Sequence, residues 1–436
     1  MLLKEALHIK AGLNMEHIEK LQSSNSTKKS ERSSSRKSKG KASKRKTLTI
    51  VALSSIPLVM TLGNSMLIPV LPSMEKHLGI SAFQTSMIIT VYSIVAIILI
   101  PIAGYLSDHI GRKKVIIPSL ILTAIGGLIA GWAAWKLKDA YLIILLGRAL
   151  QGIGASGAFP IVLPLVGDMF RNEEEVSSTL GIIETSNTLG KVLSPILGAF
   201  LAGIIWYIPF FSIPIFCAIS LIMMIFLVKS PKTKSDKIPF KKFVHNIKQI
   251  FADNKRWLFA IFSIGVILMF ILFAILFYLS DILEKNYQIE NVKKGALLSI
   301  PLGALCLASY ITGKCIKENK ILMKWITFTG IVVLTITTAF LSFSEHLWFL
   351  LGLFSLGGVG IGISLPCLDA LITEGIKKEH RGTITSIYSS MRFIGVAAGP
   401  PIMAILMVKT DAILFYLLSG FTALAAVLTF LAIKPD

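Results

Sequence analysis

The stretch "GYLSDHIGRKK", from Gly104 to Lys114, joins two long apolar runs of the chain. It holds two glycines, one acid and three consecutive basic residues within eleven positions. Glycine permits close approach and backbone angles that a Cβ resists. An acid beside an arginine can form a charge-assisted hydrogen bond. The stretch therefore predicts a turn of about seven residues that brings two helices close together and can latch them.

Apolar runs like these recur along the whole chain. Of its 436 residues, 54% are hydrophobic and only 16% are charged, so lipid rather than water is the expected solvent. A window of about 19 residues finds twelve apolar stretches of spanning length. We expect an all-α integral membrane protein with twelve transmembrane helices.

Residues 1–47 have a different composition. They contain 13 Lys and Arg against 4 acids, and they are rich in serine. This pattern predicts a disordered basic tail. Its charge either marks the topology or contacts anionic lipid headgroups. Nucleic-acid binding is not expected, because no aromatic residue interleaves the basic ones.

The basic residues are distributed unequally between the two sides of the membrane. With the tail on side one, 34 of the 44 Lys and Arg fall on that side and 7 on the other. Because basic loops stay in the cytoplasm, this predicts a multi-pass protein of the cell membrane with both termini cytoplasmic. No cofactor or metal is expected, because the four cysteines lack C-x-x-C or Cys/His spacing.

The longest polar connection after the tail, residues 229–256, separates six spans from six. It predicts an N-terminal bundle over 48–228, a cytoplasmic linker over 229–256 and a C-terminal bundle over 257–436. At a constant offset of 205, "LLGRALQGIGASG" from Leu145 aligns with "LLGLFSLGGVGIG" from Leu350, and "GKVLSP" aligns with "GVAAGP". One offset for two helices indicates duplicated six-helix bundles, as in transporters built of parallel repeats.

Four motifs resemble those of the major facilitator superfamily. The opening stretch is similar to its G-x-L-x-D-x-x-G-R-[RK] signature at Gly104, Leu106, Asp108, Gly111, Arg112 and Lys113. "RALQGIGASG" resembles R-x-x-Q-G-x-G-A at Arg148, Gln151, Gly152, Gly154 and Ala155. "GIIETSNTLGKVLSPILGA" is similar to the antiporter motif at Gly181, Gly190, Pro195 and Gly198, with Ser194 in place of a glycine. "NSMLIPVLP" resembles the first-helix element of the twelve-span drug:proton antiporter branch, but has Asn64 where many members place a carboxylate.

The resemblance implies a major facilitator fold that works by alternating access. It implies a proton-driven exporter of small amphipathic organic molecules, which we expect to act as a monomer. A dedicated exporter of one metabolite, such as a siderophore, a peptide or a sugar, is the alternative, and a non-transporting sensor is a third hypothesis. An enzyme is not expected, because no span carries a metal-ligand set or a nucleophile with histidine support.

Two structural devices are predicted from these motifs. Arg112 is expected to pair with Asp108, and Asp168 is a candidate further partner; the alternative is a basic cluster that only fixes topology. Glycines and serine at 190, 194 and 198 line one helical face, so another helix can approach closely, and Pro195 favours a kink. Such a helix suits the seam between the halves.

Charged side chains inside spans suggest the functional centre. Glu184 lies eight residues past Val176, and Arg148 lies nine residues past Asp139. At about 1.5 Å per residue, both lie near the middle of a core about 30 Å thick. Burial favours the protonated form of a carboxyl group and a nearby guanidinium favours the carboxylate, so Glu184 with Arg148 can serve proton coupling. A permanent structural ion pair is the alternative, and Asp369 is a further candidate for the proton site.

The remaining polar residues of the spans outline a substrate path. These candidates are Asn64, Gln151, Lys191 and Arg392. Lys191 is either a substrate contact or a second partner of Glu184. Arg392 either binds an anionic substrate or holds the bundle together.

Overall fold

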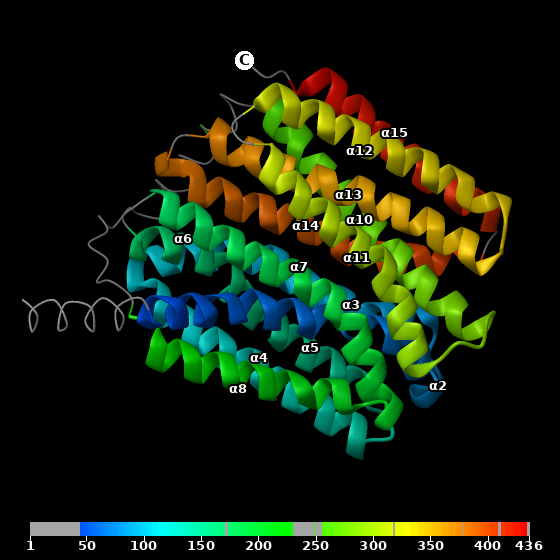
Figure 1. The fold of residues 1–436 in the computed structure, drawn as a ribbon. Helices are drawn as coiled ribbons and strands as arrows, with labels where there is room; N and C mark the ends of the chain where they lie inside the picture. Colours follow the sequence, from blue (N-terminus) through cyan, green and yellow to red (C-terminus); the bar gives the residue numbers. More distant parts are fainter. Residues whose placement is uncertain are drawn as a thin grey trace, which may run out of the picture. The chain divides into compact units, whose positions relative to one another are not determined.

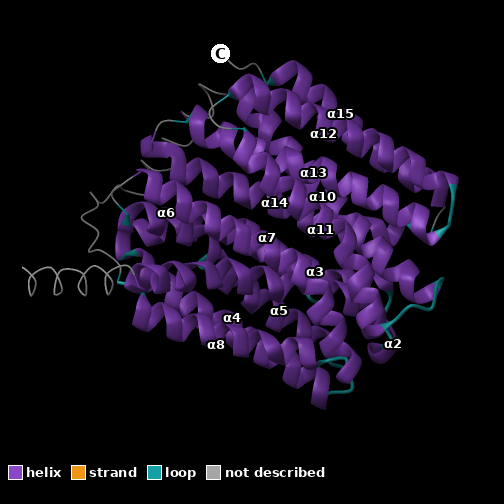
Figure 2. Cartoon of the chain, in the orientation of Figure 1, coloured by secondary structure: helices purple, strands orange, loops and turns teal. Residues whose placement is uncertain are grey.

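The computed structural model describes residues 44–170, 173–229, 249, 255–316, 319–376, 378–408 and 411–433. The elements drawn for them are helices joined by short loops (Figure 2). Twelve helices are long and apolar enough to cross a membrane, which confirms the predicted all-α class and the number of spans. The predicted tail up to residue 43 and most of the 229–256 linker lie outside the described residues.

The chain divides into two compact units, Met1–Val51 and Ala52–Asp436, and the arrangement below concerns the second. The first spanning segment is Lys44–Leu78, and its last part consists of η1 (Ile68–Val70) and α2 (Leu71–Leu78). The other helices of the N-terminal half are α3 (Ala82–Ile110), α4 (Arg112–Lys136), α5 (Tyr141–Ser156), α6 (Phe159–Met169), α7 (Glu173–Ile204) and α8 (Ile208–Leu227). The C-terminal half contains α10 (Lys255–Lys285), α11 (Asn291–Cys315), α12 (Lys320–Phe340), η2 (Leu341–Phe343), α13 (Leu347–Gly375), α14 (Lys378–Leu406) and α15 (Asp411–Ala432).

The turn between α3 and α4 is shorter than predicted. Helix α3 continues to Ile110 and α4 begins at Arg112, so Gly111 alone connects them. Its φ of 104° lies in a region that L side chains rarely adopt, which explains the need for glycine. The expected turn of about seven residues was wrong because the polar ends of both helices remain helical outside the apolar runs.

The two halves repeat the same helix contacts. Helix α4 packs along α5, and α12 packs along α13 in the other half. Between the halves, α3 packs along α14 and α7 along α11 (Figure 1). The aligned glycines also match in space. A Cβ at Gly190 would lie 3.2 Å from the Leu58 carbonyl oxygen of the first helix, and one at Gly395 would lie 3.0 Å from the Met269 Cβ of α10.

Two glycines with positive φ define the ends of the bundle used below. Gly111 marks the side where α3 meets α4, called the Gly111 side. Gly79, with φ of 64°, ends α2 and marks the opposite end of α3, called the Gly79 side.

Candidate functional site

Arg148 on α5 organises a polar centre inside the N-terminal half. Its side chain is completely buried. The guanidinium donates to Asn64 Oδ1 at 2.6 Å, to Gln151 Oε1 at 2.5 Å and to the carbonyl oxygens of Ile88 at 2.8 Å and Gly63 at 3.2 Å. Neutral acceptors from three helices therefore stabilise one buried cation.

This arrangement corrects one expectation. Among the described residues, Arg148 bonds to α3, α5 and the first helix, and the expected pairing with Glu184 was wrong. Asn64 and Gln151, both predicted on the substrate path, are 5% and 1% exposed and accept hydrogen bonds from Arg148. The guanidinium also lies 4.6 Å from the ring centre of Tyr92, so an aromatic face covers it.

Four predicted charged residues from both halves lie within electrostatic range of one another. Glu184 and Lys191 of α7 interact electrostatically with Asp369 of α13 and Arg392 of α14. Arg392 Nη1 lies 3.3 Å from Asp369 Oδ1, and the two side chains are 18% and 39% exposed. We call these four residues the central charge cluster. It holds two acids and two bases that remain partly accessible.

Glu184 is anchored by neutral partners. Asn187 Nδ2 donates to Glu184 Oε1 at 3.0 Å, and Thr61 Oγ1 of the first helix donates to Asn187 Oδ1 at 2.5 Å. The carboxylate is thus positioned by an amide rather than by a guanidinium.

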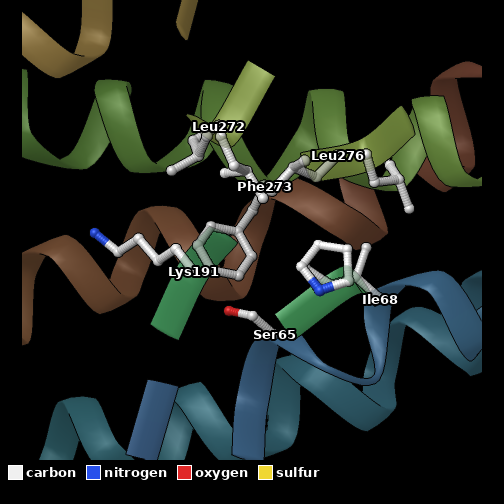
Figure 3. A pocket seen from close by; sticks show the side chains of 9 residues that line it. Ser65, Ile68, Lys191, Leu272, Phe273 and Leu276 are labelled. Carbon is white, nitrogen blue, oxygen red and sulfur yellow. The ribbon is translucent and has the colours of Figure 1, made fainter. Parts of the chain in front are cut away.

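A small apolar pocket lies beside the cluster, between the halves. Its lining includes Ser65, Ile68, Lys191, Leu272, Phe273 and Leu276. Figure 3 shows Lys191 along one edge, with its amino group turned away from the apolar side chains. The cavity measures about 10 Å³, the space that one water molecule needs. In this conformation it is too small for an organic substrate.

The signature residues of the α3–α4 turn meet on the Gly111 side. Arg112 pairs with Asp108, and its Nε lies 3.1 Å from Asp168 Oδ2 at the end of α6. Its Nη1 also donates to Ser107 Oγ at 2.7 Å. A Cβ at Gly104 would lie 3.7 Å from Ser386 Oγ of α14, an ordinary contact. One arginine thus connects three helices at a surface where α3 meets the other half.

The small-residue stripe of α7 faces the first helix rather than the seam. A Cβ at Gly190 would lie 3.3 Å from Thr61 Cγ2, and one at Gly198 would collide with the Met66 backbone. Ser194 donates to the Gly190 carbonyl at 2.5 Å, and no atom of another helix among the described residues lies within 4 Å of a Cβ at Gly181.

The seam with α11 uses another face of α7. Gly295 of α11 lies against the Pro195 carbonyl and the Ala199 Cβ. Ser299 of α11 donates to the Val192 carbonyl at 2.9 Å. The expectation that α7 forms a seam between the halves therefore fits the contacts, but the glycines do not make it.

Sequence reasoning missed an ion pair on the Gly79 side. Lys294 Nζ of α11 lies 2.8 Å from Glu284 Oε2 of α10, and the two side chains are 2% and 6% exposed. Both residues lie at helix ends, where charges are usually solvated. The available signal was an acid and a lysine on either side of the α10–α11 turn.

Sequence similarity to known proteins identifies the family of this chain. The family model described as Major Facilitator Superfamily matches residues 53–400, with a second match over 319–436. The bacillibactin exporter of Bacillus subtilis is 53% identical over 378 residues, covering 86% of this chain and 94% of the relative. Multidrug resistance protein 2 of the same organism is 24% identical over 370 residues, covering 83% and 89%.

The fold has a solved counterpart. The crystal structure of the human organic anion transporter MFSD10 superposes with a TM-score of 0.70, covering 88% of this chain and 99% of that one at 17% identity. At this identity the likeness concerns the fold alone. Together with the family match over 53–400, the twelve helices show that this chain belongs to the Major Facilitator Superfamily.

Proposed function

We propose that this membrane transporter is a proton-coupled exporter of small organic molecules, and that the central charge cluster couples the two fluxes. The observation that carries the proposal is the electrostatic interaction of Glu184 and Lys191 in one half with Asp369 and Arg392 in the other. Ionisable groups inside spans are costly, so they mark ion and substrate paths.

The cluster can respond to protons through its charge. With both carboxylates ionised, two acids balance two bases. Protonation of Asp369 weakens its hold on Arg392 at 3.3 Å and leaves the cluster one unit more positive. Because the four residues come from both halves, this change alters the attraction between the halves and toward the substrate. A proton can thereby shift the balance between two conformations.

For the substrate, we propose bacillibactin or a compound of the same kind. The support is the 53% identity with the bacillibactin exporter over most of both chains. Broad multidrug efflux is the second candidate, supported by relatives such as multidrug resistance protein 2 at 24% identity.

Uphill accumulation in proteoliposomes, with and without a pH gradient, tests both candidates. The panel contains bacillibactin and several unrelated amphipathic drugs. We expect accumulation of bacillibactin that requires the pH gradient. Drug accumulation without bacillibactin transport would favour the second candidate, and transport unaffected by the pH gradient would contradict proton coupling.

We also propose that the chain acts as a monomer in the cell membrane, with the Gly111 side and both termini in the cytoplasm. The support for this orientation is the excess of Lys and Arg in the connections on that side.

Removal of residues 1–40 is expected to leave transport and insertion largely intact, because Lys41, Lys44, Arg45 and Lys46 still mark the cytoplasmic side. Transport assays with a membrane-fraction blot check this. Lost transport with normal insertion would contradict it.

Asp108→Asn is expected to slow turnover more than it weakens substrate binding. The substitution removes the charge that pairs with Arg112, while Asp168 keeps its contact at 3.1 Å, so the helices stay folded but the latch loosens. The proposed latch biases conformations and lies far from the central cluster. Transport rates and binding affinity, measured on the same protein, separate the two effects. An unchanged rate would refute the latch, and Lys114→Met in the first turn of α4 is the control.

A further inference from the structure

Seven charged residues meet where α2 of the N-terminal half contacts the end of α10 and the start of α11 (Figure 1). We call them the Gly79-side ion cluster: Glu75, Lys76, Asp281, Glu284, Lys285, Glu290 and Lys294. It includes contacts within the C-terminal half and contacts between the halves, and the two kinds have different consequences.

Glu284 is shared by two lysines from opposite halves. Lys76 Nζ of α2 lies 2.9 Å from its Oε1, and Lys294 Nζ of α11 lies 2.8 Å from its Oε2. Lys294 is 2% exposed and Lys76 is 58% exposed. Each carboxylate oxygen therefore has its own cation, one fixed within the same half and one reaching from the other half.

Lys285 likewise contacts one residue of each half, but here one lysine is shared by two carboxylates. Its Nζ lies 2.9 Å from Asp281 Oδ1 in its own helix and 3.4 Å from Glu75 Oε2 in the other half. Beneath this layer, Ser280 donates to the Ile68 carbonyl at 3.0 Å. These contacts close the Gly79 side in this conformation.

Opening on the Gly79 side must separate α2 from α10 and α11. After separation, Glu75 and Lys76 move away with α2 and remain neighbouring charges of opposite sign. Glu284 keeps Lys294, and Lys285 keeps Asp281. A buried charge without a partner is strongly destabilising. Because each buried group retains a partner in its own half, the halves can part without that penalty.

We propose that Lys76 and Glu284 form the gate pair of the Gly79 side, and that Lys294 is the positioning residue that holds Glu284 when Lys76 departs. The proposal rests on alternating access alone, and not on the substrate or on proton coupling. It assigns opposite effects to two lysines that contact one carboxylate.

The test measures opening directly by double electron–electron resonance. Spin labels are placed at Phe83 on α3 and Val292 on α11, which are 43% and 46% exposed, in a protein whose four native cysteines are replaced. Lys76→Met is expected to raise the long-distance population by about two- to fivefold, as loss of a partly exposed ion pair implies. Lys294→Met is expected to lower the long-distance population and to slow transport by about tenfold or more. The reason is that opening then leaves the Glu284 carboxylate without an ion-pair partner.

Two further variants separate this effect from misfolding. Glu284→Gln added to Lys294→Met is expected to restore opening, because no carboxylate is left bare. Lys293→Met, at the exposed neighbouring position, is expected to change neither population nor rate. If both lysine variants shift the population in the same direction, or if Glu284→Gln fails to rescue Lys294→Met, the gate assignment is overturned. Since label distances need no substrate, a wrong substrate would leave this result unchanged.

Discussion

Replacing Glu184 with Gln is expected to abolish export against a concentration gradient driven by a pH difference, while downhill exchange of substrate continues. An antiporter needs a group that loads a proton on one side and releases it on the other, and Gln cannot do this. The substitution keeps the shape of the side chain and an oxygen that accepts from Asn187 Nδ2. The chain of hydrogen bonds through Asn187 to Thr61 therefore survives.

The measurement compares uphill accumulation with counterflow in the same proteoliposomes. Asp369→Asn is the matched variant, because Asp369 is the second carboxylate of the central charge cluster and pairs with Arg392. Continued accumulation by Glu184→Gln under a pH gradient alone would move the proton site to Asp369. Loss of both transport modes in Glu184→Gln would instead indicate a structural role.

Arg148→Met is expected to have the largest effect on stability. The substitution removes the donor from two carbonyl oxygens and from the side chains of Asn64 and Gln151, all of them away from solvent. Buried acceptors left unpaired cost about 1–3 kcal/mol each, so the loss of donors to four of them implies a loss of roughly 4 kcal/mol or more. Little folded protein should be recovered from the membrane.

Size-exclusion chromatography after heating measures this loss. Arg148→Lys keeps the charge but has a shorter, less branched donor, so its melting temperature should lie between those of wild type and Arg148→Met. Leu146→Met on the same helix is the control, since Leu146 is 63% exposed and lies away from the polar centre. A wild-type melting temperature for Arg148→Met would show that the polar centre contributes nothing to stability.

The fold was largely predictable, because a lipid solvent imposes long apolar runs that are visible in composition. The twelve spans follow from that requirement alone. The ends of the helices were not predictable in the same way. The helical segments around Gly111 continue through polar residues, and hydropathy does not register a helix outside the apolar core.

The site was predictable in its residue types but not in its pairings. Depth from the membrane surface placed Arg148 and Glu184 at one level, but depth does not specify the direction in which a side chain points around its helix. Arg148 points toward α3 and the first helix, whereas Glu184 belongs to the cluster with Asp369 and Arg392. Glu284 and Lys294 were missed because both lie at helix ends, where charges are usually solvated, and no local pattern shows that these two are buried.

The repeat with an offset of 205 has a consequence for how this molecule can be re-engineered. Gly190 and Gly395 occupy equivalent contacts, yet the charged residues have no charged counterparts: Glu184 aligns with Ser389, Lys191 with Val396 and Arg392 with Asn187. The repeat thus supplies two similar scaffolds, and their central charged residues differ. Exchanging central side chains between the halves should alter what is carried without disturbing the scaffold that carries it.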